Sequence, residues 1–222
     1  MSQIQTLILQ FANELSQNDI PKFRGAVIAS LEEKNILYHN HIDNKFRYAY
    51  PLIQYKRIHQ KAAIVCIGDG VKAIHELFAS NNFFLKIGEK ETELKMDYAK
   101  AYDNAIRICE TEQFYRLRNW LPLNSKNYGK FQNTDNLVEK IQILERILIG
   151  NILSFLKGVG IHLEEQLELH ITNITDQRSA TYKKVKLMAF DIEFKTNLSL
   201  PQYIGIGKNA SVGYGILTTI TN

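Results

Sequence analysis

The run LVEKIQILERILIGNILSFL at residues 137–156 decides the fold of the second half of the chain. Its apolar residues recur at helical spacing, which places them on one stripe of an amphipathic helix. The members of this stripe are Leu137, Ile141, Leu144, Leu148, Ile152 and Phe155. Gly158 and Gly160 follow the run, and glycine there is typical of a helix C-terminus. The sequence therefore predicts one long helix that packs a single face against a core.

Two β-rich segments follow this helix. Residues 166–174 and 181–194 alternate apolar and polar side chains, and a polar connection at residues 175–179 separates them. Such alternation is typical of strands that turn one face toward a core. The apolar run at residues 216–220 adds a last strand. The second half therefore predicts a helix, a strand pair and a final strand.

The first half predicts the order strand, helix, strand, strand, helix, strand. The segments concerned are residues 4–11, about 20–33, 46–59, 62–67, 71–79 and 83–87. Asn18 and Asp19 supply polar N-cap candidates, and Pro21 stands in the first turn of the first helix. The Gly68-Asp69-Gly70 turn separates the third strand from the second helix.

This order of elements predicts the fold class α+β, with tandem ferredoxin-like (RRM-like) βαββαβ domains and a C-terminal glycine-rich loop. The second domain is expected to lack a full second helix. We place the N-terminal domain at residues 1–125 and the C-terminal domain at residues 126–222.

The composition describes a folded protein with a mild excess of basic residues. Among 222 residues, 45% are hydrophobic and 23% are charged, which excludes a disordered or collagen-like chain. Lys and Arg number 27 against 23 Asp and Glu, and a net charge of +4 suits an anionic partner without demanding one. Cys66 and Cys109 are too few and too far apart for a disulfide framework or a zinc cluster.

The sequence also indicates where the protein works. Residues 4–12 lack both a basic leader and an apolar stretch of the length needed for export, and no later segment approaches a membrane span. We therefore expect a cytoplasmic protein.

Tyr38-His39-Asn40-His41 forms the candidate catalytic segment. Metal-independent cleavage of RNA needs one group that deprotonates the ribose 2′-hydroxyl, another that protonates the leaving 5′-oxygen, and positive charge near the phosphate. Imidazole performs either proton transfer near neutral pH. Lys45 and Arg47 follow closely and supply positive charge. If the segment is extended, His39 and His41 share one face, whereas on a helix they diverge.

The same segment allows two other interpretations. Asp43 continues the alternation of His39 and His41, so a His-x-His-x-Asp metal site is one alternative, although no second cluster of ligands accompanies it. Two surface histidines in a polar turn are the other alternative.

The stretch RYAYPLIQYKR at residues 47–57 interleaves bases and aromatic rings. On one strand, such residues place rings for base stacking and cations for phosphates. Alternatively, Tyr48, Tyr50 and Leu52 alternate into a core.

The stretch GIGKNASVGYG at residues 205–215 places four glycines before the final strand. Glycine permits positive φ and close approach of the backbone, so exposed amides could contact a phosphate or hold the neighbouring domain. Lys208 is not followed by Ser or Thr, and no helix follows, so this is not a Walker loop. A purely structural glycine-rich hairpin is the alternative.

Together, these three motifs resemble those of the CRISPR-associated endoribonucleases that process repeat RNA, within the repeat-associated mysterious protein superfamily. The matching residues are 38–41, 47–56 and the glycines of 205–215, and their order spans nearly the whole chain. The resemblance implies attack by a ribose 2′-hydroxyl on the adjacent phosphate, without metal or cofactor. The products would be a 2′,3′-cyclic phosphate or 3′-phosphate end and a 5′-hydroxyl end.

The resemblance also implies roles for individual residues. By position in the matched motif, His41 is the first candidate for general base or acid, and His39 is the second. Tyr48 would orient the ribose or assist proton transfer. Lys45, chosen for its proximity alone, or Arg47 would stabilise charge on the phosphate.

Further RNA contacts are expected from basic residues and from the glycine-rich loop. They are Arg47, Lys56, Lys183, Lys184, Gly205, Gly207, Lys208, Gly213 and Gly215. The expected partner is precursor CRISPR repeat RNA, with a CRISPR effector complex and a second copy of the chain as further candidates, and with no membrane or DNA. The competing functions are a non-cutting repeat-RNA-binding protein of the same fold and a metal-dependent enzyme that uses His39 and His41.

Overall fold

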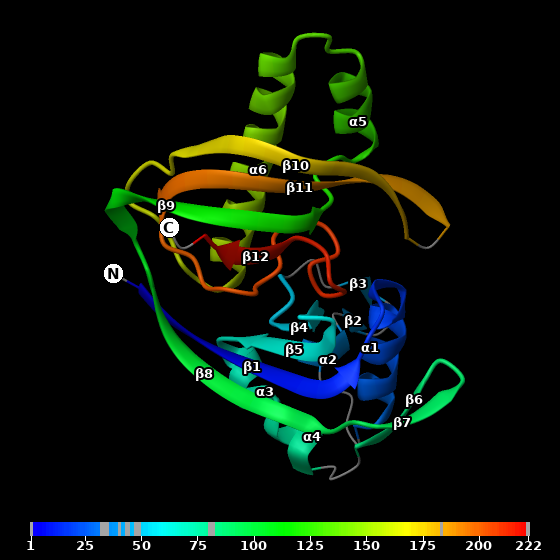
Figure 1. Ribbon diagram of the computed structural model, residues 1–222. Helices are drawn as coiled ribbons and strands as arrows, with labels where there is room; N and C mark the ends of the chain where they lie inside the picture. The colour runs from blue at the N-terminus through cyan, green and yellow to red at the C-terminus, as the bar shows by residue number, and fades with distance from the viewer. Residues whose placement is uncertain are drawn as a thin grey trace. The chain divides into compact units, whose positions relative to one another are not determined.

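The computed structural model of the protein describes residues 2–31, 36–39, 41–42, 45–46, 50–79, 83–182 and 184–220 (Figure 1). Contacts between residues divide the chain into two compact units. The N-terminal unit consists of Gln3–Asn104 together with Ser211–Gly213. The C-terminal unit consists of Met1–Ser2, Ala105–Ala210 and Tyr214–Asn222.

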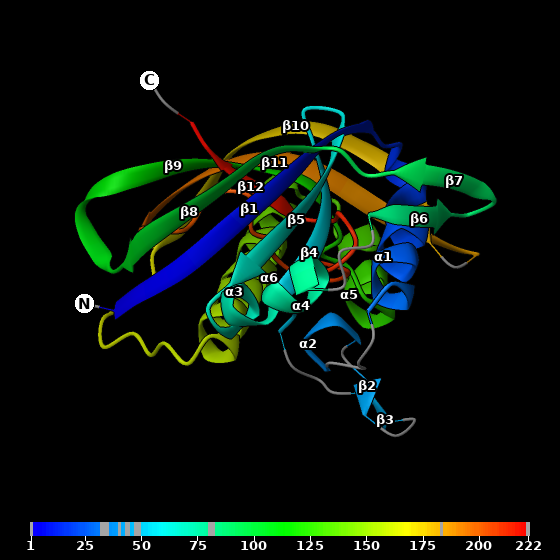
Figure 2. The same cartoon turned by 90° about the horizontal axis from the view of Figure 1, so that it is seen from below.

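The N-terminal unit is built on a four-stranded antiparallel sheet, which Figure 2 shows most clearly. Its strands are β1 (Ser2–Glu14), β4 (Ile53–Ile58), β5 (Lys61–Ile67) and β8 (Met96–Ile106), in the spatial order β4-β5-β1-β8. Helix α1 (Ile20–Ala29) follows β1, and α3 (Asp69–Ala73) and α4 (His75–Ala79) follow β5. Numbered along the chain, these four strands lie in the order second, third, first, fourth, which is the ferredoxin-like arrangement.

Shorter elements decorate this unit. They are the 3₁₀ helix η1 (Gln17–Asp19), α2 (Ile36–His39), the β2–β3 pair (His41–Ile42 and Lys45–Phe46) and the β6–β7 hairpin (Phe84–Ile87 and Lys90–Glu93). The prediction that residues 83–87 supply the fourth strand of the sheet is wrong. β6 pairs with β7 across a turn at Gly88, whose φ is +67°, and β8 takes the fourth place in the sheet.

One face of the N-terminal sheet packs against α1. Tyr55 of β4 and Phe11 of β1 both meet Phe23 of α1, with ring centroids 5.8 Å and 6.1 Å away. All three side chains are fully buried. α1 begins as predicted, with Asp19 as N-cap and Pro21 in its first turn, but it ends at Ala29 rather than near residue 33.

The opposite face of the same sheet carries polar side chains. Gln10 of β1 and Lys56 of β4 both pair with Ala63, and cross-strand partners point to the same side of a sheet. Thr6 and Gln54 lie on this side as well, because side chains alternate along each strand. All four are buried, and Lys56 is 0% exposed.

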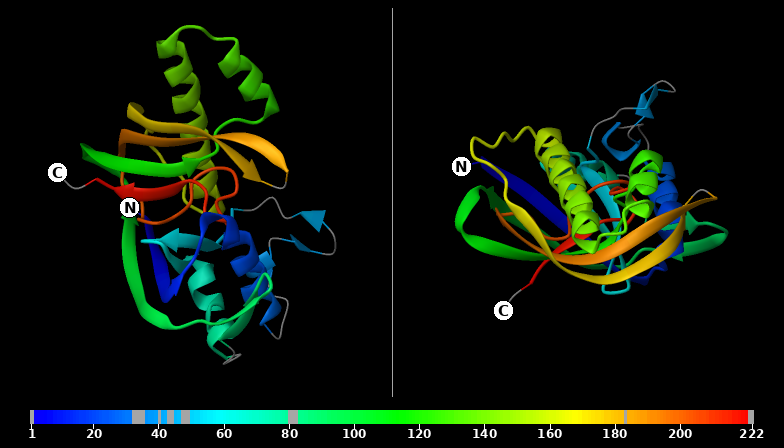
Figure 3. Two further views of the ribbon diagram at one scale, coloured as in Figure 1. Left: turned by 45° about the vertical axis from the view of Figure 1, so that its right-hand side comes forward. Right: turned by 90° about the horizontal axis from the view of Figure 1, so that it is seen from above.

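The C-terminal unit repeats the arrangement of strands. β9 (Ile108–Trp120), β10 (Leu169–Tyr182), β11 (Val185–Leu198) and β12 (Ile216–Thr219) lie in the order β10-β11-β9-β12, again second, third, first, fourth. Helices α5 (Ser125–Gln132) and α6 (Leu137–Gly158) follow the first strand, and a loop replaces a second helix between β11 and β12. Figure 3 shows the two helices beside the long β10–β11 ribbon. The predicted tandem α+β architecture is therefore confirmed.

Helix α6 confirms the most regular pattern in the sequence. Asn136 caps it, because its side-chain oxygen accepts hydrogen bonds from the amides of Val138 and Glu139. Four of the six residues of the apolar stripe are buried, namely Leu144, Leu148, Ile152 and Phe155. Leu137, at the first position of the helix, is 66% exposed.

The predicted polar connection at residues 175–179 is wrong, because these residues lie inside β10. The register runs unbroken from Asp176, opposite Asp191, to Tyr182, opposite Val185. Like charges on opposed positions repel, and Arg178 offsets this repulsion by pairing with both aspartates. A polar, solvent-facing ribbon thus resembles a loop in sequence.

Contacts within the units assign β9 to the C-terminal unit, whereas the boundary expected at residue 125 assigns it to the N-terminal one.

Among the residues that the structure describes, no helix combines the length and the apolar character needed to cross a membrane.

Candidate active site and nucleic-acid interface

The histidine segment lies where the chain changes from helix to strand. His39 is the last residue of α2, and His41 is the first residue of β2, where it pairs with Phe46 of β3. The extended geometry that would place both imidazoles on one face therefore does not hold across the segment. Lys45 lies in β3. Arg47 and Tyr48, and the side chains of His39, His41 and Lys45, lie outside the described part of the chain.

Tyr38, directly before His39, is fixed at two points in the N-terminal unit. Its side chain is 1% exposed, and its hydroxyl donates a hydrogen bond of 3.0 Å to the carbonyl of Ala73 in α3. Its own carbonyl accepts a hydrogen bond of 3.3 Å from Nη2 of Arg24 in α1. Burial raises the pKa of the Tyr38 hydroxyl, so this group stays protonated and remains a donor. The histidine segment thus starts from a fixed residue.

Arg24 was missed from the sequence as a contributor to this site. The feature of the sequence that could have identified it is a single guanidinium in the otherwise apolar run Phe23 to Ala29 of α1. A half-buried guanidinium costs less free energy when it is hydrogen-bonded, as Arg24 is to the carbonyl of Tyr38. Its partner, however, lies fourteen positions along the chain, which local patterns do not specify.

The burial of Lys56 contradicts the prediction that this residue contacts RNA. It is 0% exposed, and burial lowers the pKa of its ammonium group to about 7. A lysine that contacts phosphate must lie at the surface and carry its charge. β4 is buried at Ile53, Gln54, Tyr55 and Lys56, so this part of the aromatic and basic stretch belongs to the interior.

The glycine-rich loop is tightly packed. Gly205, Gly213 and Gly215 are buried. The amide of Gly215 donates to the carbonyl of Asn119, and a Cβ at this position would lie 1.9 Å from the carbonyl oxygen of Ile206. Close packing therefore explains the need for glycine, and the phosphate contacts of these three glycines stay a prediction.

The other glycine of the loop serves packing as well. Gly207 has a φ of +90°, and a Cβ there would lie 2.6 Å from Oδ1 of Asn151. That oxygen accepts a hydrogen bond of 2.9 Å from Nε1 of Trp120. Lys208, next in the chain, is exposed and stays a candidate for RNA contact.

Cations gather at the free end of the β10–β11 ribbon. Lys184 and Lys186 are exposed there, and Lys184 adopts a φ of +66° in the turn. Lys183 lies outside the described residues. Arg178 is less available to bind a phosphate than these lysines are, because its guanidinium pairs with Asp176 and, at 2.9 Å, with Asp191.

The metal alternative concerns His39, His41 and Asp43. The described side chains contain no group of three or more His, Cys, Asp or Glu that could hold a metal ion. The side chains of His39 and His41, and all of Asp43, lie outside that description.

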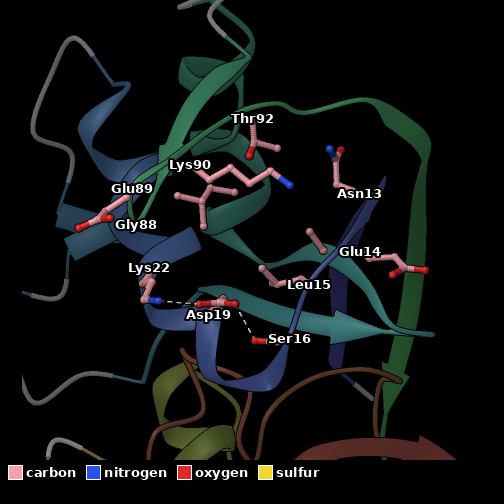
Figure 4. Close-up of a pocket in the computed structure, with 12 residues that line it drawn as sticks. Asn13, Glu14, Leu15, Ser16, Asp19, Lys22, Gly88, Glu89, Lys90 and Thr92 are labelled. Atoms are coloured by element: carbon pink, nitrogen blue, oxygen red, sulfur yellow. Dashed lines mark hydrogen bonds and ion pairs between the residues drawn. The ribbon is translucent and has the colours of Figure 1, made fainter.

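The N-terminal unit also contains a cavity of about 720 Å³, which Figure 4 shows in close-up. It lies between the end of β1, the start of α1 and the β6–β7 hairpin. Three carboxylates and two ammonium groups line it, namely those of Glu14, Asp19, Glu89, Lys22 and Lys90. Lys22 and Asp19 neutralise each other at 2.8 Å. The excess of carboxylates makes this cavity unsuited to a nucleic-acid backbone.

Comparison with known families finds two matching models. The model of the Cas6b N-terminal domain matches residues 2–104, and that of the Cas6b C-terminal domain matches residues 107–220. A curated relative, an uncharacterized protein of Methanocaldococcus jannaschii, is 35% identical over 119 residues, which are 53% of this chain and 80% of that protein.

Solved structures agree with the family models. One described as the crystal structure of Cas6b is 28% identical and superposes with a TM-score of 0.90, covering 99% of this chain and 100% of that one. Another, described as the CRISPR RNA processing endoribonuclease Cas6b, is 26% identical with a TM-score of 0.76 over 99% of this chain and 100% of that one. The similarity thus extends over both units.

Proposed function

The chain belongs to the Cas6b family of CRISPR RNA processing endoribonucleases, and from this membership we propose that it cuts precursor repeat RNA without a metal ion, using His39 and His41 for proton transfer. The observation that carries the proposal is the placement of two histidines directly after the anchored residue Tyr38. A fixed starting point limits the positions that both imidazoles reach, and orientation of reacting groups is a large part of such catalysis.

The proposed reaction is balanced by two proton transfers. One imidazole takes the proton of the ribose 2′-hydroxyl, the 2′-oxygen forms a bond to phosphorus, and the bond from phosphorus to the 5′-oxygen breaks. The second imidazole, protonated, gives its proton to the leaving 5′-oxygen. The products are a 2′,3′-cyclic phosphate, which water can open to a 3′-phosphate, and a 5′-hydroxyl. Each proton-transfer group contributes roughly 10²–10⁴-fold to the rate.

The roles within the site follow from position in the sequence. His41 is the first candidate for base or acid and His39 the second, and Tyr48 is proposed to orient the ribose. Lys45 and Arg47 supply the positive charge that stabilises the pentavalent phosphate. A CRISPR effector complex and a second copy of the chain stay predictions as further partners.

The experiment is cleavage of the cognate repeat RNA in excess EDTA, followed by analysis of the product ends. We expect one cut at a fixed site, with a 5′-hydroxyl on the downstream product. Cleavage that stops in EDTA and returns with a divalent cation would support the metal-dependent alternative. Tight binding with no cleavage under either condition would support the non-cutting alternative.

A matched set of variants tests the histidines. His41→Ala should slow single-turnover cleavage by at least roughly 10²-fold while repeat affinity changes little, because the variant loses a proton-transfer group and not a phosphate anchor. His162→Ala, which removes an exposed histidine from the C-terminal unit, is the control and should cleave at the wild-type rate. Wild-type cleavage by the double variant of His39 and His41 would contradict the proposal.

A further inference from the structure

A cavity of about 290 Å³ opens between α5 and the free end of the β10–β11 ribbon. We call it the α5 pocket. Its walls include Tyr128 of α5, Gln177 and Ser179 of β10, and Lys186 and Met188 of β11. All of these residues belong to the C-terminal unit. None of them forms part of the histidine segment or of the glycine-rich loop.

The fold creates this pocket by opening a packed interface. Phe131 of α5 meets Phe190 of β11 edge to face, with ring centroids 5.8 Å apart. Tyr128 lies one helical turn before Phe131, and Met188 lies two residues before Phe190 on the same side of its strand. The next layer toward the ribbon end therefore consists of Tyr128 and Met188. Phe131 and Phe190 are buried, whereas Tyr128 is 46% exposed, so this layer is open to solvent.

The chemistry of the walls suits a flat heteroaromatic ring. Tyr128 offers a ring face, and the Met188 thioether offers a soft, polarizable surface. The Gln177 amide and the Ser179 hydroxyl offer a donor and acceptors for the edge of a base. Gln177 and Met188 already lie 3.4 Å apart, from amide nitrogen to sulfur. Small-molecule pockets usually measure about 300–1,000 Å³, so the α5 pocket suits a ligand near the small end of that range.

The charge around the pocket favours an anionic chain. Lys184 and Lys186 are exposed on the ribbon end, and Lys186 also lines the pocket. The nearby carboxylates of Asp176 and Asp191 are both engaged by Arg178. A base held in the pocket would therefore have the cations of the ribbon end near its flanking phosphates.

We propose that the α5 pocket holds one unpaired nucleobase of the repeat RNA, stacked on Tyr128, with its edge toward Gln177 and Ser179. This inference rests on the proposed function, because the RNA bound is the repeat that the enzyme processes. It goes beyond that function, because the pocket binds and selects RNA without taking part in proton transfer. It also explains why an exposed tyrosine lies beside a basic ribbon.

The test is a scan of the repeat with single abasic nucleotides, measured by equilibrium binding to the full-length protein. The scissile nucleotide carries 2′-deoxyribose so that the RNA stays intact. For wild-type protein, removal of the base at one position should weaken binding about 10-fold, within the range expected for one base stacked on an aromatic side chain. The Tyr128→Ala variant should bind the unmodified repeat about as weakly, and it should lose its sensitivity to that abasic position alone.

Three further variants keep the result independent of folding. Tyr128→Phe retains the ring and should bind nearly as the wild type does. Ser179→Phe fills the pocket from β10 and should reproduce the Tyr128→Ala profile. Tyr102→Ala, which removes a tyrosine of similar exposure from the N-terminal unit, should leave the sensitivity to that abasic position intact.

Identical abasic profiles for the wild type, Tyr128→Ala and Ser179→Phe would overturn the pocket while leaving the proposed cleavage untouched. A wild-type protein that binds but does not cut would overturn the cleavage proposal. Its abasic profile, measured on RNA that keeps the 2′-hydroxyl at the scissile nucleotide, would still decide the pocket. A wild-type protein that fails to bind the repeat would overturn both.

Discussion

The hydroxyl of Tyr38 connects the histidine segment to α3, and its removal should affect catalysis as well as stability. Tyr38→Phe leaves the buried carbonyl of Ala73 without its donor, which should lower the free energy of unfolding by roughly 1–3 kcal/mol. Because the next residue is His39, we also expect single-turnover cleavage to slow several-fold, while repeat affinity is unchanged. The cleavage rate and the repeat affinity are both measured well below the melting temperature of the variant.

Tyr115 supplies a matched control for this prediction. It is equally a buried tyrosine, and its hydroxyl accepts a hydrogen bond of 2.8 Å from the amide of Leu200 in the C-terminal unit. Tyr115→Phe should lower stability to a similar degree but leave the cleavage rate unchanged. Equal rate losses in the two variants would assign the effect of Tyr38 to stability alone.

Lys56 should make the stability of the protein depend on pH in an unusual direction. Burial lowers its pKa from 10.5 to about 7 in the folded chain, so between these values the unfolded chain binds a proton that the folded chain lacks. The free energy of unfolding therefore rises with pH across this window, by at most roughly 1.4 kcal/mol per pH unit. Below pH 7 both states bind the proton, and the full cost of burying the charge remains.

The Lys56→Met variant isolates this contribution. It should be more stable than the wild type at pH 6.5, and its advantage should shrink as the pH rises toward 10. Urea unfolding at several pH values measures the difference, in which the titration of all other groups cancels. Lys126→Met, which removes an exposed lysine, controls for the loss of one charge. A constant difference between Lys56→Met and wild type across the window would show that Lys56 does not titrate there.

At the scale of single residues, sequence specifies chemical types better than surroundings. His39 and His41 are candidates from their side chains alone, since few residues transfer protons near neutral pH. The burial of Lys56 was not foreseen, because alternating bases and aromatic rings occur both on nucleic-acid surfaces and on strands covered on both faces. The bond from Tyr38 to Ala73 joins residues 35 positions apart, which no local pattern encodes.

At the scale of elements, a Gly→Ala substitution in the glycine-rich loop should change the stability of the protein in the opposite direction from a Gly→Ala substitution in α6. Gly215→Ala places a Cβ 1.9 Å from a backbone oxygen at a φ of +60°, which should cost roughly 3 kcal/mol or more. Gly150→Ala, in the exposed interior of α6, meets nothing within 4 Å and should stabilise the protein by roughly 1 kcal/mol. Chemical denaturation of both variants measures the difference. A mild effect at Gly215 would mean that the loop is not tightly packed.

The elements differ in how well the sequence predicts them, and solvent exposure explains the difference. α6 buries a continuous stripe, so its apolar period is visible. β9 alternates Arg116 and Arg118 with Tyr115 and Leu117, and it was not recognised as a strand because its polar face also carries long charged side chains. Arg116 pairs with Glu193 of β11 at 2.6 Å, an interaction that only the sheet order brings together.

Over the whole molecule, the same strand order occurs twice, and the sequence indicated the repeat through its succession of strands and helices. Neither sheet order nor unit membership follows from that succession alone. The unit formed by residues 3–104 also includes Ser211–Gly213, far along the chain. There, the amide of Tyr55 donates a hydrogen bond of 2.9 Å to the carbonyl of Ser211, and Gln17 donates to the carbonyl of Gly213. The N-terminal unit is thus completed by a segment that a fragment cut at residue 104 would lack.

A fragment of residues 1–104 should therefore expose the outer edge of β4. In the full-length protein the Tyr55 amide is bonded to Ser211, and a buried amide in such a bond exchanges slowly with solvent. In the fragment that partner is missing, so we expect the Tyr55 amide to exchange much faster in hydrogen-exchange NMR. Amides of β5, which lies between β4 and β1, should keep most of their protection because both neighbours remain. If Tyr55 were protected equally in both forms, residues 211–213 would not be needed to complete the sheet edge. If β5 lost protection as well, the fragment would be unfolded as a whole.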